Sequence, residues 1–374
     1  MIGSQVHFVW RNPPDLREFR TGVSLHGHTM HSQECLSFLP RYLHQIPGVS
    51  QITRRYERPM PGSGPAVDFA RAYWTPPLSP AAAMRLEKGQ IEGLGLHPLV
   101  SLTDHDDIEA GLALQVAHDR GDTPVSVEWT VPYCSSILHL GIHNLPPCAE
   151  RAWLVAMADY TLAPDEASLP ELLSSLARIP DALVVLNHPF WLEEGVVGED
   201  HERALARFLP QCVEWIHAFE LNATRPWREN AATIALAHAH GRPLISGGDR
   251  HASEPSANLN LTNAECFSEF AAEIKHGNST LLFMPQYREP LGLRILEAGW
   301  DILRPHPEYP GRERWTDRIF YRGEDGAPRP LSAIWKDRVP WMLNIPTAIL
   351  QVLATRQLRA AIRLLLAQRG EALQ

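Results

Sequence analysis

The residues best suited to chemistry are closely spaced histidines and carboxylates that follow short apolar runs. Residues 25–29 read LHGHT, with His26 and His28 one residue apart, and residues 246–251 read SGGDRH, with Asp249 and His251 in the same spacing. Residues i and i+2 of an extended chain point to the same side, so each pair can reach one ion. Imidazole and carboxylate ligands suit Zn, Fe and Mn. Such a pair taken alone is more often structural, so the prediction of a metal site depends on the whole set of motifs.

Further polar residues of the same kind occur in or after other apolar runs. They are His105 in LTDHD (102–106), Glu128 after 125–127, His139 within 137–142 and His188 in LNHP (186–189). A histidine inside an apolar strand can also be a core residue with its hydrogen bonds satisfied, which remains open for His139. His143 is a second candidate on the same strand face. Asp106 or Asp107 is expected to cap a helix that begins near residue 108.

Helical patterns alternate with these runs. They cover residues 108–120, 168–178, 201–208 and 229–240. Most of the strand-like runs are continuously apolar, as expected for strands buried on both faces. The alternation predicts parallel β/α architecture, in which the polar residues gather at the carboxyl ends of the strands.

Composition narrows the possible functions. The chain has 374 residues, a net charge of −9 and 44 % hydrophobic residues, and it lacks a Lys/Arg tract, so we expect no nucleic-acid partner. Its five cysteines form no CxxC pair and are expected to be reduced thiols. Residues 1–20 lack the apolar core of a secretory signal, and no apolar run is long enough to span a membrane. We therefore expect a cytoplasmic protein without a membrane partner.

Taken together, the motifs resemble those of the PHP (polymerase and histidinol phosphatase) superfamily. The resemblance covers residues 23–252 and leaves out 35–97 and the chain after about 290. It implies a distorted (β/α)7 barrel with a long insertion after the first strand and a C-terminal helical extension. As domains, we expect a metal-binding barrel over 1–290, with the insertion at 35–97, and an extension over 291–374 that packs on the barrel.

The resemblance also implies two or three divalent metal ions (Zn, Mn or Fe). One ion would be bound by His26, His28, Glu128 and Asp249, a second by Glu128, His139 and His188, and a third by His105 and His251. The ligand that family members supply shortly after the HxHT motif is missing, and Glu34 is the candidate replacement, with His31 in reserve.

The implied activity is hydrolysis of a small phosphoester by a metal-bridging hydroxide. The expected catalytic residues are Glu128, Asp249 and His251. The candidate substrate-binding residues are Arg250, Arg225 and Arg228, which could grip a phosphate. Asp104 and Asn187 are expected to orient ligand histidines.

Alternative functions stay open at this point. A metal-dependent amide or ester hydrolase often adds a carboxylated lysine, but Lys88, Lys275 and Lys336 lie outside the motifs. A nuclease would need a basic surface, and a non-catalytic metal-binding regulator fits the altered segment 30–35. The sequence leaves the substrate, the metal and the oligomeric state open. Arg356, Arg359 and Arg363 lie on one stripe of a predicted helix over 340–374, which we expect to pack on the domain rather than on a membrane.

Overall fold

The computed structural model describes residues 3–36, 71–117, 123–193 and 195–336, and six single positions beyond them: 348, 352, 358, 360, 362 and 363. Most of the predicted insertion lies outside the described residues, as does most of the predicted helix over 340–374, with Arg356 and Arg359.

The first sheet has five strands and pairs the first strand of the chain with a strand near residue 280. In spatial order they are β1 (Gly3–Phe8), β12 (Asn278–Phe283), β11 (Asn258–Thr262), β2 (Thr21–Leu25) and β5 (His97–Ser101). The pairs β1–β12 and β2–β5 are parallel, and β11 runs antiparallel to both of its neighbours. This sheet therefore pairs β2, which precedes the LHGHT motif, with β5, which precedes LTDHD.

The second sheet also has five strands. In spatial order they are β10 (Leu244–Gly247), β9 (Ala218–Asn222), β8 (Leu183–Asn187), β7 (Ser136–His143) and β6 (Val127–Tyr133). The strands β8, β9 and β10 are parallel, whereas β7 is antiparallel to both β6 and β8.

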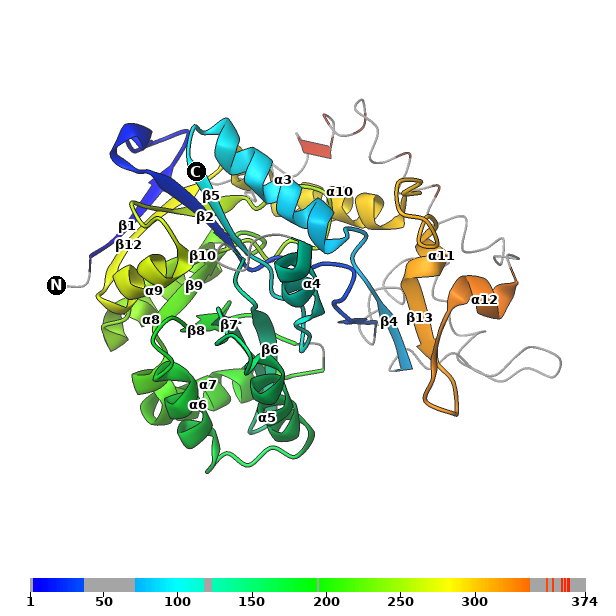
Figure 1. The fold of residues 1–374 in the computed structure, drawn as a ribbon, viewed down its shortest axis with the longest axis horizontal. Coiled ribbons are helices and arrows are strands. Elements are labelled where there is room, and N and C mark those ends of the chain that lie inside the picture. Colours follow the sequence, from blue (N-terminus) through cyan, green and yellow to red (C-terminus); the bar gives the residue numbers. More distant parts are fainter. Residues whose placement is uncertain are drawn as a thin grey trace.

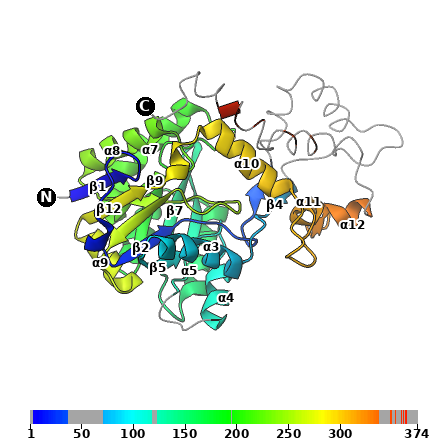
Figure 2. The same cartoon turned by 90° about the horizontal axis from the view of Figure 1, so that it is seen from above.

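A third sheet is built from the start of the predicted insertion, its end and the C-terminal part of the chain. Its order is β14 (Pro328–Pro330), β13 (Ile319–Arg322), β4 (Ala72–Trp74) and β3 (Glu34–Cys35), with antiparallel pairing throughout. Figures 1 and 2 both show α11 and α12 to one side of the two larger sheets, and Figure 1 shows β13 beside them. The two regions outside the family resemblance thus fold together.

Helices cover the outside of the sheets (Figure 1). They are α3 (Pro80–Gly93), α4 (Glu109–Ala117), α5 (Glu150–Leu162), α6 (Leu169–Ala177), α7 (Gly198–Cys212), α8 (Trp227–His240), α9 (Phe267–Lys275), α10 (Leu291–Leu303), α11 (Trp315–Arg318) and α12 (Leu331–Trp335). Short 3₁₀ turns occur at η1 (Leu16–Glu18), η3 (Val213–Trp215) and η4 (Pro285–Arg288). The four predicted helices correspond to α4, α6, α7 and α8, and are confirmed.

Local sequence explains where several helices begin and end. Ser79 caps α3 by accepting a hydrogen bond from the Ala82 backbone, and Pro80 occupies the first helical position. The helix α8 ends at Gly241, whose φ of 60° is the left-handed conformation that glycine adopts without strain.

The predicted single (β/α)7 barrel is wrong. The described strands form three separate sheets and no closed barrel. Between the first and second sheets the pairing consists of isolated bridges, Gly27 with Arg250 and His105 with Glu128. The antiparallel strands β7 and β11 also break the parallel repeat that the sequence predicted.

The two larger sheets nevertheless share an apolar cluster. It joins side chains of β2 and β5 in the first sheet to side chains of β8, β9 and β10 in the second: Val23, Leu25, Leu99, Leu183, Val185, Ala218 and Ile245. Residues of α9, including Phe270, complete it. Because this cluster holds β2 and β5 against β8 and β10, the motifs that follow these strands lie at one edge of the packed sheets.

Candidate metal centre

Three of the predicted ligands lie in turns with unusual backbone geometry. The strand β2 ends at Leu25, and His26 has a φ of 58°; β10 ends at Gly247, and Asp249 has a φ of 47°. His188, just after β8, has a φ of 24°. Positive φ is costly for residues other than glycine and concentrates at functional sites. The HxH and DxH pairs are therefore aimed by turns after the strands and not by strand alternation.

Glu128 and His139 reach the site by a different route from the one predicted. They lie on the two strands of a β-hairpin, where Glu128 is the second residue of β6 and His139 pairs with Asn187 of β8. Glu128 thus begins a strand and does not terminate one. A backbone bond from Glu128 N–H to the Asp104 carbonyl, 3.1 Å long, attaches this hairpin to the end of β5.

Glu128 is the centre of the cluster and is fully buried. Its Oε2 lies 2.8 Å from Nε2 of His26, 3.3 Å from Nε2 of His28 and 3.4 Å from Nε2 of His105. Its Oε1 lies 3.0 Å from Nε2 of His188 and 3.7 Å from Nδ1 of His139. One carboxylate therefore faces five imidazoles, three on one oxygen and two on the other.

Glu34, on β3, gathers a second group of ligands. Its Oε2 lies 3.3 Å from Nε2 of His251 and 3.6 Å from Nε2 of His105. His28, Glu34, His105 and His251 can present ligand atoms that all lie within 4.8 Å of one another. The structure thus brings Glu34 into a group of possible metal ligands, whereas His31 donates its backbone N–H to the Thr29 hydroxyl.

Two more groups with the same spacing surround His26. One combines His26 with Glu128 and His188, and the other combines His26 with His28 and Asp249. His139 belongs to neither group, although its ring lies beside Glu128.

The donor set fits divalent cations. The Nε2 atom of His28 is buried and has no hydrogen-bond partner in the described part of the chain. An orphaned buried ring nitrogen is costly unless something binds it, and a metal ion does so. Neutral imidazoles mixed with carboxylates are ligands that Zn, Fe and Mn accept. The residues present therefore suit the metals that the sequence motifs imply.

Electrostatics within the cluster agree with this assignment. Burial disfavours a charged Glu128, yet the facing His26 and His105 hold its pKa well below the usual value. Burial likewise opposes charge on His251, but Glu34 and Asp249 raise the pKa of His251 to about 9. The mutual attraction thus favours ionised acids beside protonated imidazoles, and a bound cation would replace the protons of those imidazoles.

Behind His26 lies Glu220, a buried acid of β9 that was not among the predicted site residues. Glu220 Oε2 is 2.6 Å from Nδ1 of His26, and Asn222 Nδ2 donates to Glu220 Oε1 at 2.7 Å. Gly247 makes room for this acid, because a Cβ at that position would lie 2.0 Å from Glu220 Oε2. The available signal was an acid inside the apolar run Ala218–Asn222.

The neighbouring acids and amides orient the loops. Asp104 accepts hydrogen bonds from the backbone and the hydroxyl of Thr29, so it fixes the HxHT turn and does not contact a histidine ring. Burial raises the pKa of Asp104 to about 7.

Asn187 donates to Glu128 Oε1 at 3.0 Å, and Asp107 accepts from the Glu109 backbone at the start of α4. Asp106 instead accepts from the Thr130 backbone.

The three candidate arginines are placed very differently. Arg225 lies at the centre, where its Nη2 is 3.1 Å from Asp249 Oδ2 and its guanidinium stacks 3.7 Å from the Trp191 ring centroid. Arg250 is buried and held by Glu87 at 2.9 Å and by the Ala252 carbonyl, so it faces away from the cluster. Arg228 is 86 % exposed and pairs with Glu229.

His143, the second candidate on β7, also lies apart from the ligand groups. Its Nδ1 is 2.8 Å from the Ser101 hydroxyl, and its ring packs near Phe267. Burial lowers the pKa of His143 to about 3, so it is a neutral core histidine.

One side of the centre is more open than the other. His26, His28 and Glu128 are fully buried. His251, His105 and Glu34 keep 23 %, 19 % and 12 % of their side chains exposed. Ligands from solvent therefore approach past Glu34 and His251, where the Trp74 ring lies 5.9 Å from the His251 ring.

No family model and no curated protein matches the chain. Among solved structures, PsfC of Pseudomonas syringae is 15 % identical with a TM-score of 0.36, over 72 % of this chain and 93 % of that chain. A protein of Bifidobacterium adolescentis, provisionally described as a metal-dependent phosphoesterase, is 14 % identical (TM-score 0.35, covering 54 % and 92 %). An amidohydrolase of Chromobacterium violaceum, solved with sulfate and no metal, is 19 % identical (TM-score 0.31, covering 47 % and 83 %).

At TM-scores this low, these neighbours assign neither a family nor an activity to the chain. Among the described residues, no helix has the length and apolar character needed to cross a membrane.

Proposed function

We propose that the protein is a metal-dependent phosphoester hydrolase of the PHP type, acting on a small phosphorylated molecule. The observation that carries this proposal is the position of Glu128. Its two oxygens face separate sets of imidazoles, with His26, His28 and His105 on one side and His139 and His188 on the other. A carboxylate shared in this way suits a centre that holds more than one cation.

Divalent cations bound there would lower the pKa of water and neutralise the oxygens of a phosphoryl group. The chain's own residues would position the metal ligands and bind the phosphoryl group. Glu220 keeps Nδ1 of His26 occupied, so that Nε2 points into the centre. Asn222 and Thr224 donate to Asp249 Oδ2, which fixes that carboxylate.

Arg225 is the residue that we assign to the phosphoryl group. It lies beside Asp249 and is stacked on Trp191, which restricts its motion. Its Nε is buried and has no hydrogen-bond partner in the described residues, so one donor remains for a ligand. A guanidinium held in this way suits the planar fork contact with phosphate oxygens.

The three lysines of the chain give no support to a carboxylated-lysine mechanism. Lys275 Nζ donates to the carbonyls of Ile179 and Pro180, at the far end of α9. Lys88 lies on α3 and Lys336 directly follows α12, so neither belongs to the strands or turns that carry the candidate ligands. An amide hydrolase built on such a lysine is therefore the weaker proposal.

The test is phosphate release from a panel of phosphomonoesters and diesters, using protein whose metal content has been measured by mass spectrometry. We expect turnover that chelation abolishes and that Mn²⁺, Zn²⁺ or Fe²⁺ restores. Turnover that survives exhaustive chelation would refute the metal mechanism. Bound metal without turnover of any ester would refute the phosphoesterase assignment.

Glu128→Gln sharpens this test. Because one carboxylate serves several imidazole-lined positions, we expect bound metal and turnover to fall together, turnover by at least about a hundredfold. Glu109→Gln is the matched control, since Glu109 pairs with Arg151 at the surface. Full metal content and full turnover in Glu128→Gln would contradict the shared role of Glu128.

A further inference from the structure

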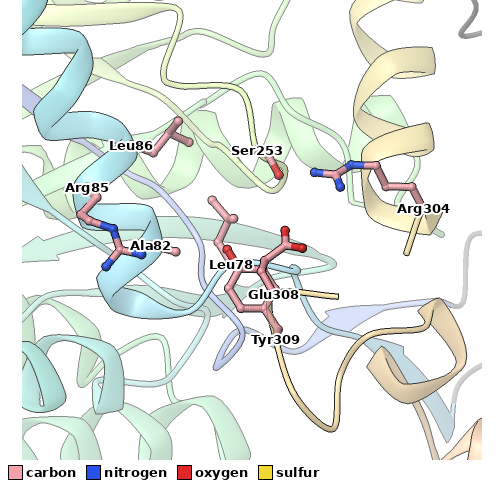
Figure 3. Close-up of a pocket in the computed structure, with 8 residues that line it drawn as sticks. All are labelled: Leu78, Ala82, Arg85, Leu86, Ser253, Arg304, Glu308 and Tyr309. Atoms are coloured by element: carbon pink, nitrogen blue, oxygen red, sulfur yellow. The ribbon is translucent and has the colours of Figure 1, made fainter. Parts of the chain in front are cut away.

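A separate cavity of about 360 Å³ lies between α3 and the segment that follows α10 (Figure 3). Arg85 of α3 and Arg304 after α10 line it, together with Ser253 and Tyr309. The side chains of Leu78 and Leu86 add an apolar wall. Its volume lies at the lower end of the range for small-molecule sites, and it is widely open to solvent.

The two arginines give the cavity its positive character. Figure 3 shows their guanidinium groups on opposite sides of the cavity, with that of Arg304 directed toward Ser253. Arg85 has no carboxylate partner in the described part of the chain, because the ion pairs found there do not include it. Ser253 contributes a hydroxyl that is buried and has no hydrogen-bond partner among the described residues.

The acids near the cavity contact groups other than Arg85. Glu308 also lines it, but its Oε1 lies 3.1 Å from Nδ1 of the buried His306. Asp301 accepts from Arg304 Nε and from the Ser253 backbone, both at 2.5 Å. No described carboxylate lies within ion-pair distance of Arg85, so an anion entering the cavity would supply its partner.

Two short connections tie this cavity to the metal centre. Ser253 follows the ligand His251 by two residues, so their Cα atoms are at most about 7 Å apart. On the other wall, the Leu78 carbonyl accepts a hydrogen bond from Met30, two residues after the ligand His28. The cavity thus adjoins the segments that carry His28 and His251.

We infer that this pocket binds a second anionic group, a carboxylate or a phosphate, at the non-reacting end of the substrate. This inference rests on the proposed phosphoesterase function. It narrows the substrate class to small phosphoesters with a second negative charge, carried on a body that can lie against Leu78 and Leu86.

The kinetic test compares monophosphate esters of ω-hydroxy acids with alkyl phosphates of the same length, and with terminal bisphosphates. The measured quantity is the ratio of kcat/KM for the doubly anionic ester to kcat/KM for the alkyl ester. Arg85→Met should lower this ratio about tenfold, because it removes one charge-assisted contact. Lys88→Met, on the same helix but outside the pocket lining, should leave the ratio unchanged. If only the hydroxy-acid esters are preferred over the alkyl esters, the second anion is a carboxylate. If only the bisphosphates are preferred, it is a phosphate.

A binding test separates failure of this inference from failure of the proposed function. Glutarate is titrated calorimetrically into the intact Glu128→Gln protein, in which the metal centre is impaired, with and without Arg85→Met. Binding that is lost with Arg85→Met supports the pocket, even if no phosphoester is hydrolysed. If glutarate binding and the kinetic ratio are both unaffected by Arg85→Met, the inference is overturned while the phosphoesterase proposal stands.

Discussion

At the scale of single residues, the orientation of His26 depends on Glu220. The carboxylate contacts Nδ1 of His26 and also accepts from Asn222, so both of its oxygens act as acceptors. Such a contact fixes the ring tautomer and raises the basicity of the nitrogen that binds metal. Glu220 therefore fixes the orientation of His26 at the buried end of the centre, although Glu220 is not itself one of the predicted metal ligands.

Glu220→Gln should weaken metal binding about tenfold to a hundredfold. A glutamine places its NH₂ group against either His26 Nδ1–H or the Asn222 donor, so one donor meets another. Equilibrium dialysis against Zn²⁺ or Mn²⁺ measures the change, and Glu214→Gln, at an exposed position, serves as the control. An unchanged dissociation constant would show that Glu220 does not orient His26.

Residue types and spacing singled out histidines and acids that lie close together in the structure, because most of them follow or interrupt an apolar run. They did not predict the buried pair of Arg250 with Glu87, which lies between residues 163 positions apart. An arginine next to two ligands has the same local pattern whether it faces the centre or a distant acid. Only the packing of α3 against the 249–256 loop decides between these cases.

At the scale of elements, the third sheet depends on Arg318 at the end of α11. Its guanidinium is buried and donates to the carbonyls of Arg312, Glu313, Ile302 and Arg304. Its own carbonyl accepts from Thr75, just after β4. The side chain of Arg318 thus ties the end of α10 to α11, and the backbone carbonyl of Arg318 ties α11 to β4.

Arg318→Met should destabilise the protein by roughly 3–5 kcal/mol, because it leaves four carbonyl groups without their charged donor. Urea unfolding followed by circular dichroism measures the loss. Arg329→Met is the control, since Arg329 forms an exposed pair with Asp325. A change below about 1 kcal/mol would mean that the four carbonyls find other partners.

The hairpin of β6 and β7 shows that local sequence patterns predict strands but not the direction in which the strands pair. Both strands were predicted, but as members of a parallel series, because each has a β-like apolar run. Antiparallel pairing is set by the tight connection between Tyr133 and Ser136, which carries no Asn-Gly or Asp-Gly signal. The third sheet is harder still to predict from the sequence, since it pairs residues 72–74 with residues 319–321.

At the scale of the whole molecule, stability toward acid depends on buried neutral histidines. His217, just before β9, accepts a hydrogen bond from the Val184 backbone through Nδ1 at 2.9 Å. Burial lowers the pKa of His217 to about 4, and the charges of Lys275 and Arg242 act in the same direction. The folded state therefore binds this proton less readily than the unfolded chain does.

The sign of the pH effect follows from this difference. Between about pH 6.5 and pH 4 the unfolded chain holds a proton on His217 that the folded protein lacks, so the free energy of unfolding falls on acidification. His217→Asn, whose Oδ1 can accept from Val184, should make this fall less steep. Urea midpoints measured across the range test it, with the exposed His238→Asn as control. Equal slopes in the two variants would rule out His217 as a source.

The position of Glu34 on β3 has a consequence for the order of biosynthesis. Its strand pairs with β4, whose other edge is covered by β13, near the far end of the described chain. During translation, the segments that carry His26, Glu128 and Asp249 leave the ribosome well before Ile319–Arg322 does. The cation position around Glu34 is therefore the last to acquire its full support, and a nascent chain released early would carry an incomplete centre.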